Sequence, residues 1–207
     1  GSQNVAVGYQ AMYAAGSSDA NTAIGDRALM SNTTGVRNVA VGSVALPVND
    51  VGSDNIAIGY GALNSSVSDS YMTAFGARAL EAMNGAVGAN DAFGYQSMSN
   101  MTTGGYNSAL GYQTLHKSSA GESNVALGYA ALQNNAGGTY NTAIGSQAMV
   151  TDTGGNSNTV VGYIAYRRGD GTGFYNTALG YASLYSNTDG SDNTAIGSRP
   201  MEQNTTG

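Results

Sequence analysis

The stretch Asn141-Thr142-Ala143-Ile144-Gly145-Ser146-Gln147-Ala148-Met149 decides the fold, because versions of it recur along all 207 residues. Its central glycine defines position zero of a repeat that occurs in twelve copies. These glycines are Gly8, Gly25, Gly42, Gly59, Gly76, Gly94, Gly111, Gly128, Gly145, Gly162, Gly180 and Gly197. Their spacing is constant, except that the intervals from Gly76 to Gly94 and from Gly162 to Gly180 are longer by a single residue. A short fixed period along a whole chain is the signature of a solenoid.

The residues before the glycine have the composition of a short β-strand. Position −3 is mostly Thr, Val or Ile, position −2 is Ala in every copy but one, and position −1 is always apolar. The stretch is too short for a helix and has no 3.6-residue apolar spacing, so it predicts a strand. The predicted fold class is therefore all-β: a parallel β-solenoid (β-roll or β-helix) of twelve coils of about 17 residues.

Position −4 is Asn in eleven of the twelve copies, and Met72 takes the remaining place. The eleven are Asn4, Asn21, Asn38, Asn55, Asn90, Asn107, Asn124, Asn141, Asn158, Asn176 and Asn193. Identical amides stacked from coil to coil can donate from NH₂ and accept at the carbonyl oxygen, which forms a ladder. We therefore predict a structural role for this asparagine row, with the twelve glycines as turn residues.

Alternation along the strand assigns its residues to two faces. Asn, Ala and Gly share a thin face, and the Thr/Val and Ile/Leu positions share a bulky one. After the glycine, the pair Ala131-Leu132 and its equivalents predict a second short strand whose Leu meets the Ile row across the coil. Because such a core is narrow, we expect the Ala/Gly face to be buried against another copy of the chain.

Tyrosines recur at two positions of the repeat. Position +1 is Tyr in seven copies: Tyr9, Tyr60, Tyr95, Tyr112, Tyr129, Tyr163 and Tyr181. Such a row is either receptor-facing, as a platform for carbohydrate or protein, or structural, as a cover for the coil edge or a seam between chains. Position −5 is Tyr in alternate copies, at Tyr71, Tyr106, Tyr140 and Tyr175, which raises the question whether one turn holds one or two copies. We favour one.

Copies such as Ser53-Asp54-Asn55-Ile56-Ala57-Ile58-Gly59-Tyr60-Gly61-Ala62-Leu63 and Asn141-Thr142-Ala143-Ile144-Gly145 resemble two related groups. One is the head repeat of trimeric autotransporter adhesins, whose short coils form a left-handed parallel β-roll in which three chains pack together. The other is the N-T-A-I-G-x-x-A-L repeat of phage tail-fibre-like and bacterial surface proteins. The resemblance covers the whole chain and implies a left-handed, trimeric solenoid on a virion tail fibre or a bacterial cell surface.

Composition bounds the domain organisation and the partners. The unbroken register indicates a single domain over residues 1–207, a piece of a longer fibre protein with Gly1-Ser2 as a cloning remnant. Only 10% of the residues are charged and the net charge is −6, which argues against a nucleic-acid partner. No apolar run is long enough for membrane insertion. The expected partners are further copies of the chain, as a homotrimer, and a cell-surface glycan or protein receptor.

The sequence offers no catalytic constellation. There is no Cys, and His116 is the sole His, so neither a metal centre nor a cofactor site is predicted. Acidic residues are scattered between the copies, which is more typical of a solvated face than of the paired carboxylates of a glycan-cleaving enzyme. Arg168-Gly169-Asp170 spells a tripeptide used by some integrin ligands, but three residues recur by chance.

We therefore expect a non-enzymatic structural and adhesive segment of an extracellular fibre, which forms a rod and binds a receptor or surface. Two alternatives stay open. A polysaccharide-degrading tailspike segment needs two neighbouring loop carboxylates. An ice- or crystal-surface-binding solenoid needs a flat array of Thr, and the threonines at position −3 (Thr22, Thr142, Thr159, Thr177 and Thr194) are interrupted by other residues.

Overall fold

The computed structural model describes residues 1–151, 153–167 and 173–206. These residues hold twelve β-strands and no helix, which confirms the all-β prediction. The chain packs as two compact units, Gly1–Gly105 and Tyr106–Gly207. The single domain expected over residues 1–207 stays a prediction.

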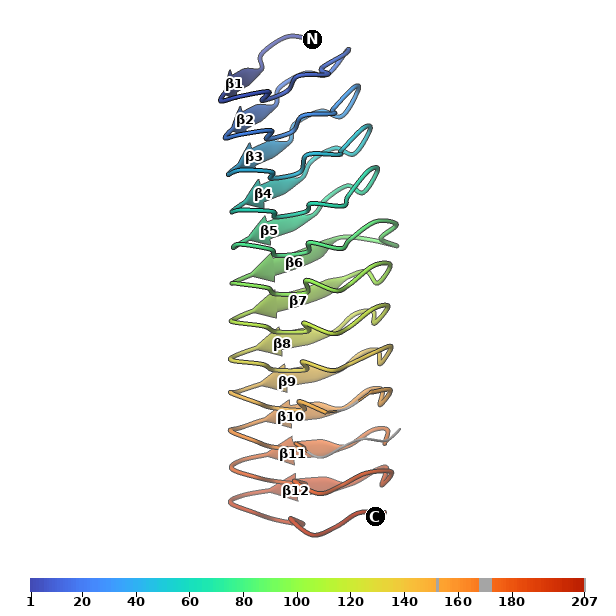
Figure 1. Cartoon of the computed structure of the whole chain (residues 1–207). Helices are drawn as coiled ribbons and strands as arrows, with labels where there is room; N and C mark the ends of the chain where they lie inside the picture. Colours follow the sequence, from blue (N-terminus) through green and yellow to red (C-terminus); the bar gives the residue numbers. More distant parts are fainter. Residues whose placement is uncertain (152, 168–172, 207) are drawn as a thin grey trace. The chain divides into compact units, whose positions relative to one another are not determined.

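Each unit contributes six strands, which lie parallel and side by side in chain order (Figure 1). In the first unit the strands are β1 (Val5–Val7), β2 (Thr22–Ile24), β3 (Val39–Val41), β4 (Ile56–Ile58), β5 (Thr73–Phe75) and β6 (Asn90–Phe93). In the second they are β7 (Asn107–Leu110), β8 (Val125–Leu127), β9 (Thr142–Ile144), β10 (Thr159–Val161), β11 (Thr177–Leu179) and β12 (Thr194–Ile196).

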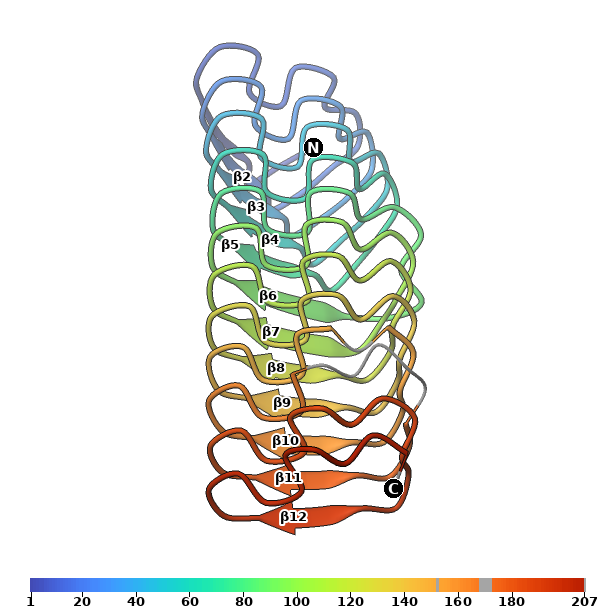
Figure 2. The same cartoon turned by 60° about the horizontal axis from the view of Figure 1, so that its bottom comes forward.

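The register between strands shows that one coil contains one copy of the repeat. Ala126 of β8 lies opposite Ala143 of β9, which in turn lies opposite Val160 of β10, so equivalent positions of successive copies are paired. Every coil has its strand on one side and returns through turns on the other (Figure 2). The repeat-length coils of the predicted solenoid and the one-copy interpretation are therefore confirmed. The left-handed coiling of the solenoid and the trimer stay predictions.

The zero-position glycines bring consecutive coils into backbone contact. Gly145 has φ of 133°, and a Cβ atom there would overlap the carbonyl oxygen of Gly162 in the next coil. Both the backbone conformation and the absence of space exclude an L side chain. The backbone N–H of Gly162 also donates to the carbonyl oxygen of Ile144 at 2.8 Å, so the chain turns at the glycine without leaving the stack.

The two strand faces are oriented opposite to the prediction. The alanines at position −2, such as Ala143, are fully buried inside the coil, whereas the large side chains at position −1 point outward. The interior volume is filled instead by position +4, here called the inner leucine row. Its buried members are Met12, Leu29, Leu46, Leu63, Leu80, Met98, Leu115, Leu132, Met149, Tyr166 and Leu184. On the strand side the interior of the coil is narrow, and the methyl groups of the buried alanines fill it.

The second strand predicted at Ala131-Leu132 is wrong. These residues form a turn in which Ala130 and Leu132 have φ of 55° and 51°. Positive and negative φ therefore alternate along the turn, and the backbone is not extended as in a strand. The turn is nevertheless tied to the next coil, because the N–H of Leu132 donates to the carbonyl oxygen of Ala148 at 3.0 Å. Leu132 is fully buried, but it packs behind the alanine row and does not meet the outward Ile row.

Candidate functional site

The asparagine row lines the interior and binds consecutive coils together. The backbone N–H of Asn158 donates to Asn141 Oδ1 at 3.0 Å, and Asn141 Nδ2 donates to the carbonyl oxygen of Gly155 at 2.7 Å. Each amide thus satisfies one group in the next coil and one where its own coil closes. Asn21, Asn38, Asn55, Asn90, Asn107, Asn124, Asn141, Asn158, Asn176 and Asn193 are all buried, so they do not face a partner.

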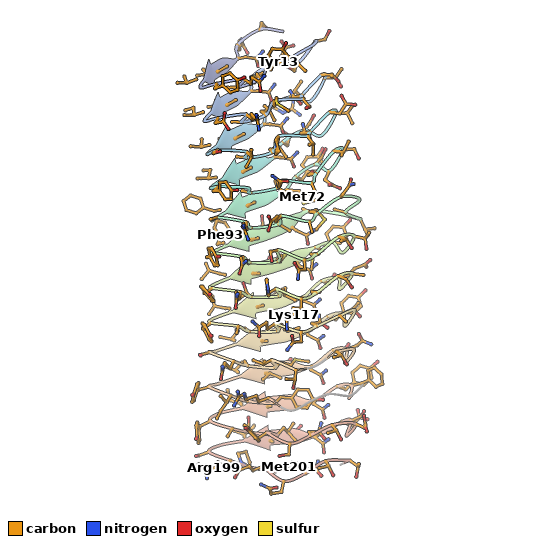
Figure 3. All side chains as sticks on the ribbon, viewed as in Figure 1. Tyr13, Met72, Phe93, Lys117, Arg199 and Met201 are labelled. Atoms are coloured by element: carbon orange, nitrogen blue, oxygen red, sulfur yellow. The ribbon has the colours of Figure 1, made fainter. Side chains whose placement is uncertain are left out.

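Met72 replaces the amide in one coil of the first unit without opening the core (Figure 3). Its backbone N–H still donates to Asn55 Oδ1 at 3.0 Å. On the other side, Asn90 Nδ2 lies 3.9 Å from Met72 Sδ and donates to the carbonyl oxygen of Gly104 at 2.8 Å. The thioether occupies the space that an amide takes in the other coils, and the hydrogen bond from the backbone N–H of Met72 to the preceding asparagine is kept.

A second buried polar row, not predicted from the sequence, lies at position +7. Its asparagines and serines are Asn32, Asn49, Ser66, Ser118, Asn135 and Asn187, all buried. Asn49 Nδ2 donates to Asn32 Oδ1 at 2.8 Å and to the carbonyl oxygen of Gly52 at 3.0 Å. The recurrence of Asn at this position was the signal that would have revealed it. Like the first row, it stabilises the coil from within.

The outward side chains at position −1 form an exposed apolar strip on each unit, here called the outer apolar row. In the first unit Val7, Ile24, Phe75 and Phe93 are exposed, and in the second Leu110, Leu127, Leu179 and Ile196 are exposed. Phe75 and Phe93 stack with ring centroids 6.4 Å apart, and Figure 3 labels Phe93 at the end of β6. Val41, Ile58, Ile144 and Val161 continue the row half-buried.

The tyrosines at position +1 follow the glycine at the rim of this strip. Tyr9, Tyr60, Tyr95, Tyr112, Tyr129, Tyr163 and Tyr181 are all exposed. Tyr112 and Tyr129 stack with centroids 5.6 Å apart and planes 14° apart, and Tyr163 and Tyr181 stack at 6.0 Å and 21°. In these two pairs the rings lie on one another along the coil axis. The tyrosines at position −5 are also exposed.

Charged side chains are rare at the outward positions of the strands and lie mainly at other positions of the repeat. Arg37 and Asp54, at position −5 of neighbouring coils, form a two-pronged ion pair with Nε–Oδ1 and Nη2–Oδ2 distances of 2.6 and 2.7 Å. The hydrogen bonding from Arg37 lowers the pKa of the Asp54 carboxyl from its ordinary value. On the strand face itself, the outward positions −3 and −1 hold a single charged residue, Asp91. The strip is thus an almost uncharged surface.

No group of three or more His, Cys, Asp or Glu residues that would hold a metal ion occurs in the described part of the chain. The same residues include no helix long and apolar enough to cross a bilayer. Arg168-Gly169-Asp170 lies outside the described residues. The candidate site is therefore the outer apolar row with its tyrosine rim. The sequence matches no family model, and no curated protein or solved structure is significantly similar to it.

Proposed function

We propose that this chain is a non-enzymatic structural and adhesive segment of an extracellular fibre, a phage tail fibre or a bacterial surface adhesin, and that it works as a homotrimer. The observation that carries the proposal is the outer apolar row on the open face of each parallel sheet. The tyrosine rim, exposed beside it, provides the adhesive surface.

Parallel sheets are normally covered on both faces. Here one face of each sheet packs on the inner leucine row, and the other presents Val, Ile, Leu and Phe side chains to solvent. Contiguous apolar surface of this kind marks an interaction site in a soluble protein. Further copies of the chain are the natural cover, because the row has the same period in every copy. The number three comes from the resemblance of the repeats to trimeric fibre heads.

The interface expected from the sequence was the Ala/Gly face, and that expectation is wrong because the alanines are inside the coil. The outer apolar row takes its place in the proposal. The asparagine and glycine rows hold each coil, and the outer row holds the chains together.

Sedimentation equilibrium tests the assembly. At micromolar concentration the chain should show about three times its mass of 20.9 kDa. The double variant Leu127→Asp with Leu179→Asp should return the mass of a single chain, because charge on the outer row opposes its burial. The matched control Ala120→Asp with Ala136→Asp adds the same charge at exposed loop positions and should keep the trimer. A single-chain mass for the unaltered protein would contradict the proposed assembly. Cleavage of a polysaccharide by the purified chain would favour the enzymatic alternative instead.

One observation favours a second candidate, the ice- or crystal-surface binder. In the second unit Thr142, Thr159, Thr177 and Thr194 occupy position −3 of the four consecutive strands β9 to β12 and face outward. They form a short regular hydroxyl row at the strand spacing of about 4.8 Å. Thermal hysteresis in a freezing-point measurement, lost in Thr159→Lys, would support this candidate, and its absence would remove it.

A further inference from the structure

The longer coil between β5 and β6 contains the sole Asn-Gly pair of the sequence, Asn84-Gly85. The pair lies outside the strands, in the part of the coil that returns from β5 to β6 (Figure 1). Both residues are exposed, and Gly85 has φ of 109°. A Cβ atom added to Gly85 would meet nothing closer than 3.9 Å, so the backbone has open space around it. The loop therefore has room for a rearrangement of its main chain.

A buried carboxylate binds the backbone nitrogen of Gly85. Asp69, which is only 5% exposed, accepts at Oδ1 from the N–H of Gly85 at 2.9 Å and from that of Ala86 at 2.7 Å. Its Oδ2 accepts from the hydroxyl of Ser66 at 2.9 Å. Three hydrogen bonds thus fix the carboxylate against the loop, with one oxygen directed at the Gly85 nitrogen. Most other copies of the repeat have glycine at the position of Asp69, so this contact is particular to the longer coil.

The side chain of Asn84 lies next to that nitrogen along the chain. It is exposed, unlike the buried amides of the asparagine row, while its backbone N–H donates to the carbonyl oxygen of Thr102 at 3.1 Å and ties the loop to the next coil. Only three carbon atoms separate the amide carbon of Asn84 from the nitrogen of Gly85. Rotation within this one residue therefore brings the two atoms together and closes a five-membered ring.

We propose that Asn84-Gly85 is a self-modification site, at which Asp69 acts as the base in the loss of the Asn84 amide. The peptide nitrogen attacks through its π electron pair, which is perpendicular to the plane of the N–H bond, so the hydrogen bond to Asp69 does not block the attack. As the new N–C bond forms, the N–H becomes acidic. Its proton passes to Asp69 Oδ1, which already lies within the reach of a general base.

The reaction balances with water as the only added reagent. Attack moves an electron pair of the amide C=O bond onto the oxygen. When that double bond forms again, the bond to the amide nitrogen breaks, and the nitrogen takes up one proton and leaves as ammonia. The Asp69 carboxylate is regenerated, and a succinimide ring joins Asn84 to Gly85. Water opens this ring at either carbonyl and leaves aspartate or isoaspartate, which adds one negative charge to the loop.

Peptide mapping by mass spectrometry tests the site, because conversion of the amide to an acid raises the mass of the peptide by nearly one unit. At neutral pH the folded chain should convert this position at least about tenfold faster than a synthetic peptide of residues 80–90, which has the same sequence but lacks Asp69. Asn100 is also exposed but is followed by Met101, and it should keep its amide over the same time.

Two variants identify the base. Asp69→Asn should slow the conversion in the folded chain at least about tenfold. The matched control Asp26→Asn removes an exposed carboxylate after β2 and should leave the rate unchanged. Circular dichroism verifies the fold of both variants. A loosened loop would speed the reaction, so only the loss of a base predicts a decrease.

Either of two results would overturn the proposal. One is a rate in the folded chain no higher than in the synthetic peptide, which would show that the hydrogen bond to Asp69 protects the loop. The other is an equal or higher rate in a folded Asp69→Asn variant. If that variant does not fold, the comparison between the unaltered chain and the peptide decides by itself.

Discussion

Gly145 lies where a side chain has no room, between its own coil and the carbonyl oxygen of Gly162. Gly145→Ala should destabilise the chain by more than about 2 kcal/mol, because it combines a left-handed backbone strain of about 1–3 kcal/mol with a steric overlap. Thermal and denaturant unfolding measure the effect. Gly61→Ala is the control for a glycine without coil contact, since its φ of 64° is close to the 55° that Ala130 adopts at the same repeat position, and its Cβ would meet nothing closer than 3.9 Å. Equal losses in the two variants would contradict a special requirement for glycine at Gly145.

Asn141 joins three parts of the structure through one amide. It accepts from the backbone of Asn158 and donates to Gly155, and its own N–H donates to Asn124 Oδ1 at 2.9 Å. Asn141→Ala removes the acceptor of the buried Asn158 N–H and one donor to the carbonyl oxygen of Gly155, which should cost about 2–4 kcal/mol of unfolding free energy.

The control for this substitution is Asn64→Ala. Asn64 is half-buried, lies outside both polar rows and makes a single long contact of 3.5 Å to the carbonyl oxygen of Val44. Its loss should stay below about 1 kcal/mol. If Asn141→Ala cost no more than Asn64→Ala in the same urea titration, the asparagine row would not be what holds consecutive coils together.

The strand is the element in which the orientation of the two faces is decided. Ala143 is fully buried between β9 and the inner leucine row, whereas Gln147, beyond the glycine, is half-buried at the surface of the turn. Ala143→Leu should destabilise by about 1–3 kcal/mol or more, because the added carbons have no free volume. Gln147→Leu should be nearly silent. Equal melting temperatures for the two variants would contradict the assignment of Ala143 to the interior.

Much of the element structure could be predicted from the sequence. The constant spacing of the glycines gives the coil length, and the alternation Asn-x-Ala-x-Gly correctly places the asparagine and alanine rows, such as Asn141 and Ala143, on one shared face. Alternation does not say which face is inside. That depends on the turn after the glycine, where Ala130 and Leu132 adopt positive φ without being glycines. Stacking between coils imposes these conformations, so the local conformational propensities of the residues do not predict them.

At the scale of the whole molecule, the outer apolar row and the inner leucine row differ in how far one chain buries them. The inner row is satisfied within one chain, since Leu115 and Leu132 are fully buried. The outer row is not, since Leu110 and Leu127 are 52% and 42% exposed. A core this narrow is expected to require further copies of the chain, and that expectation stays a prediction. The face expected from the sequence was the wrong one, because large apolar side chains are expected inside and small ones at a close interface.

Hydroxyl-radical footprinting across a dilution series tests the proposed assembly most directly, because it compares leucines of the same chemistry on opposite sides of the sheet. Leu115 and Leu132 should stay protected at every concentration. Leu110, Leu127 and Leu179 should be protected in the concentrated sample and become labelled on dilution, together with the fall in mass to 20.9 kDa. Equal labelling of these three leucines at all concentrations, with no change in mass, would contradict an assembly through the outer apolar row.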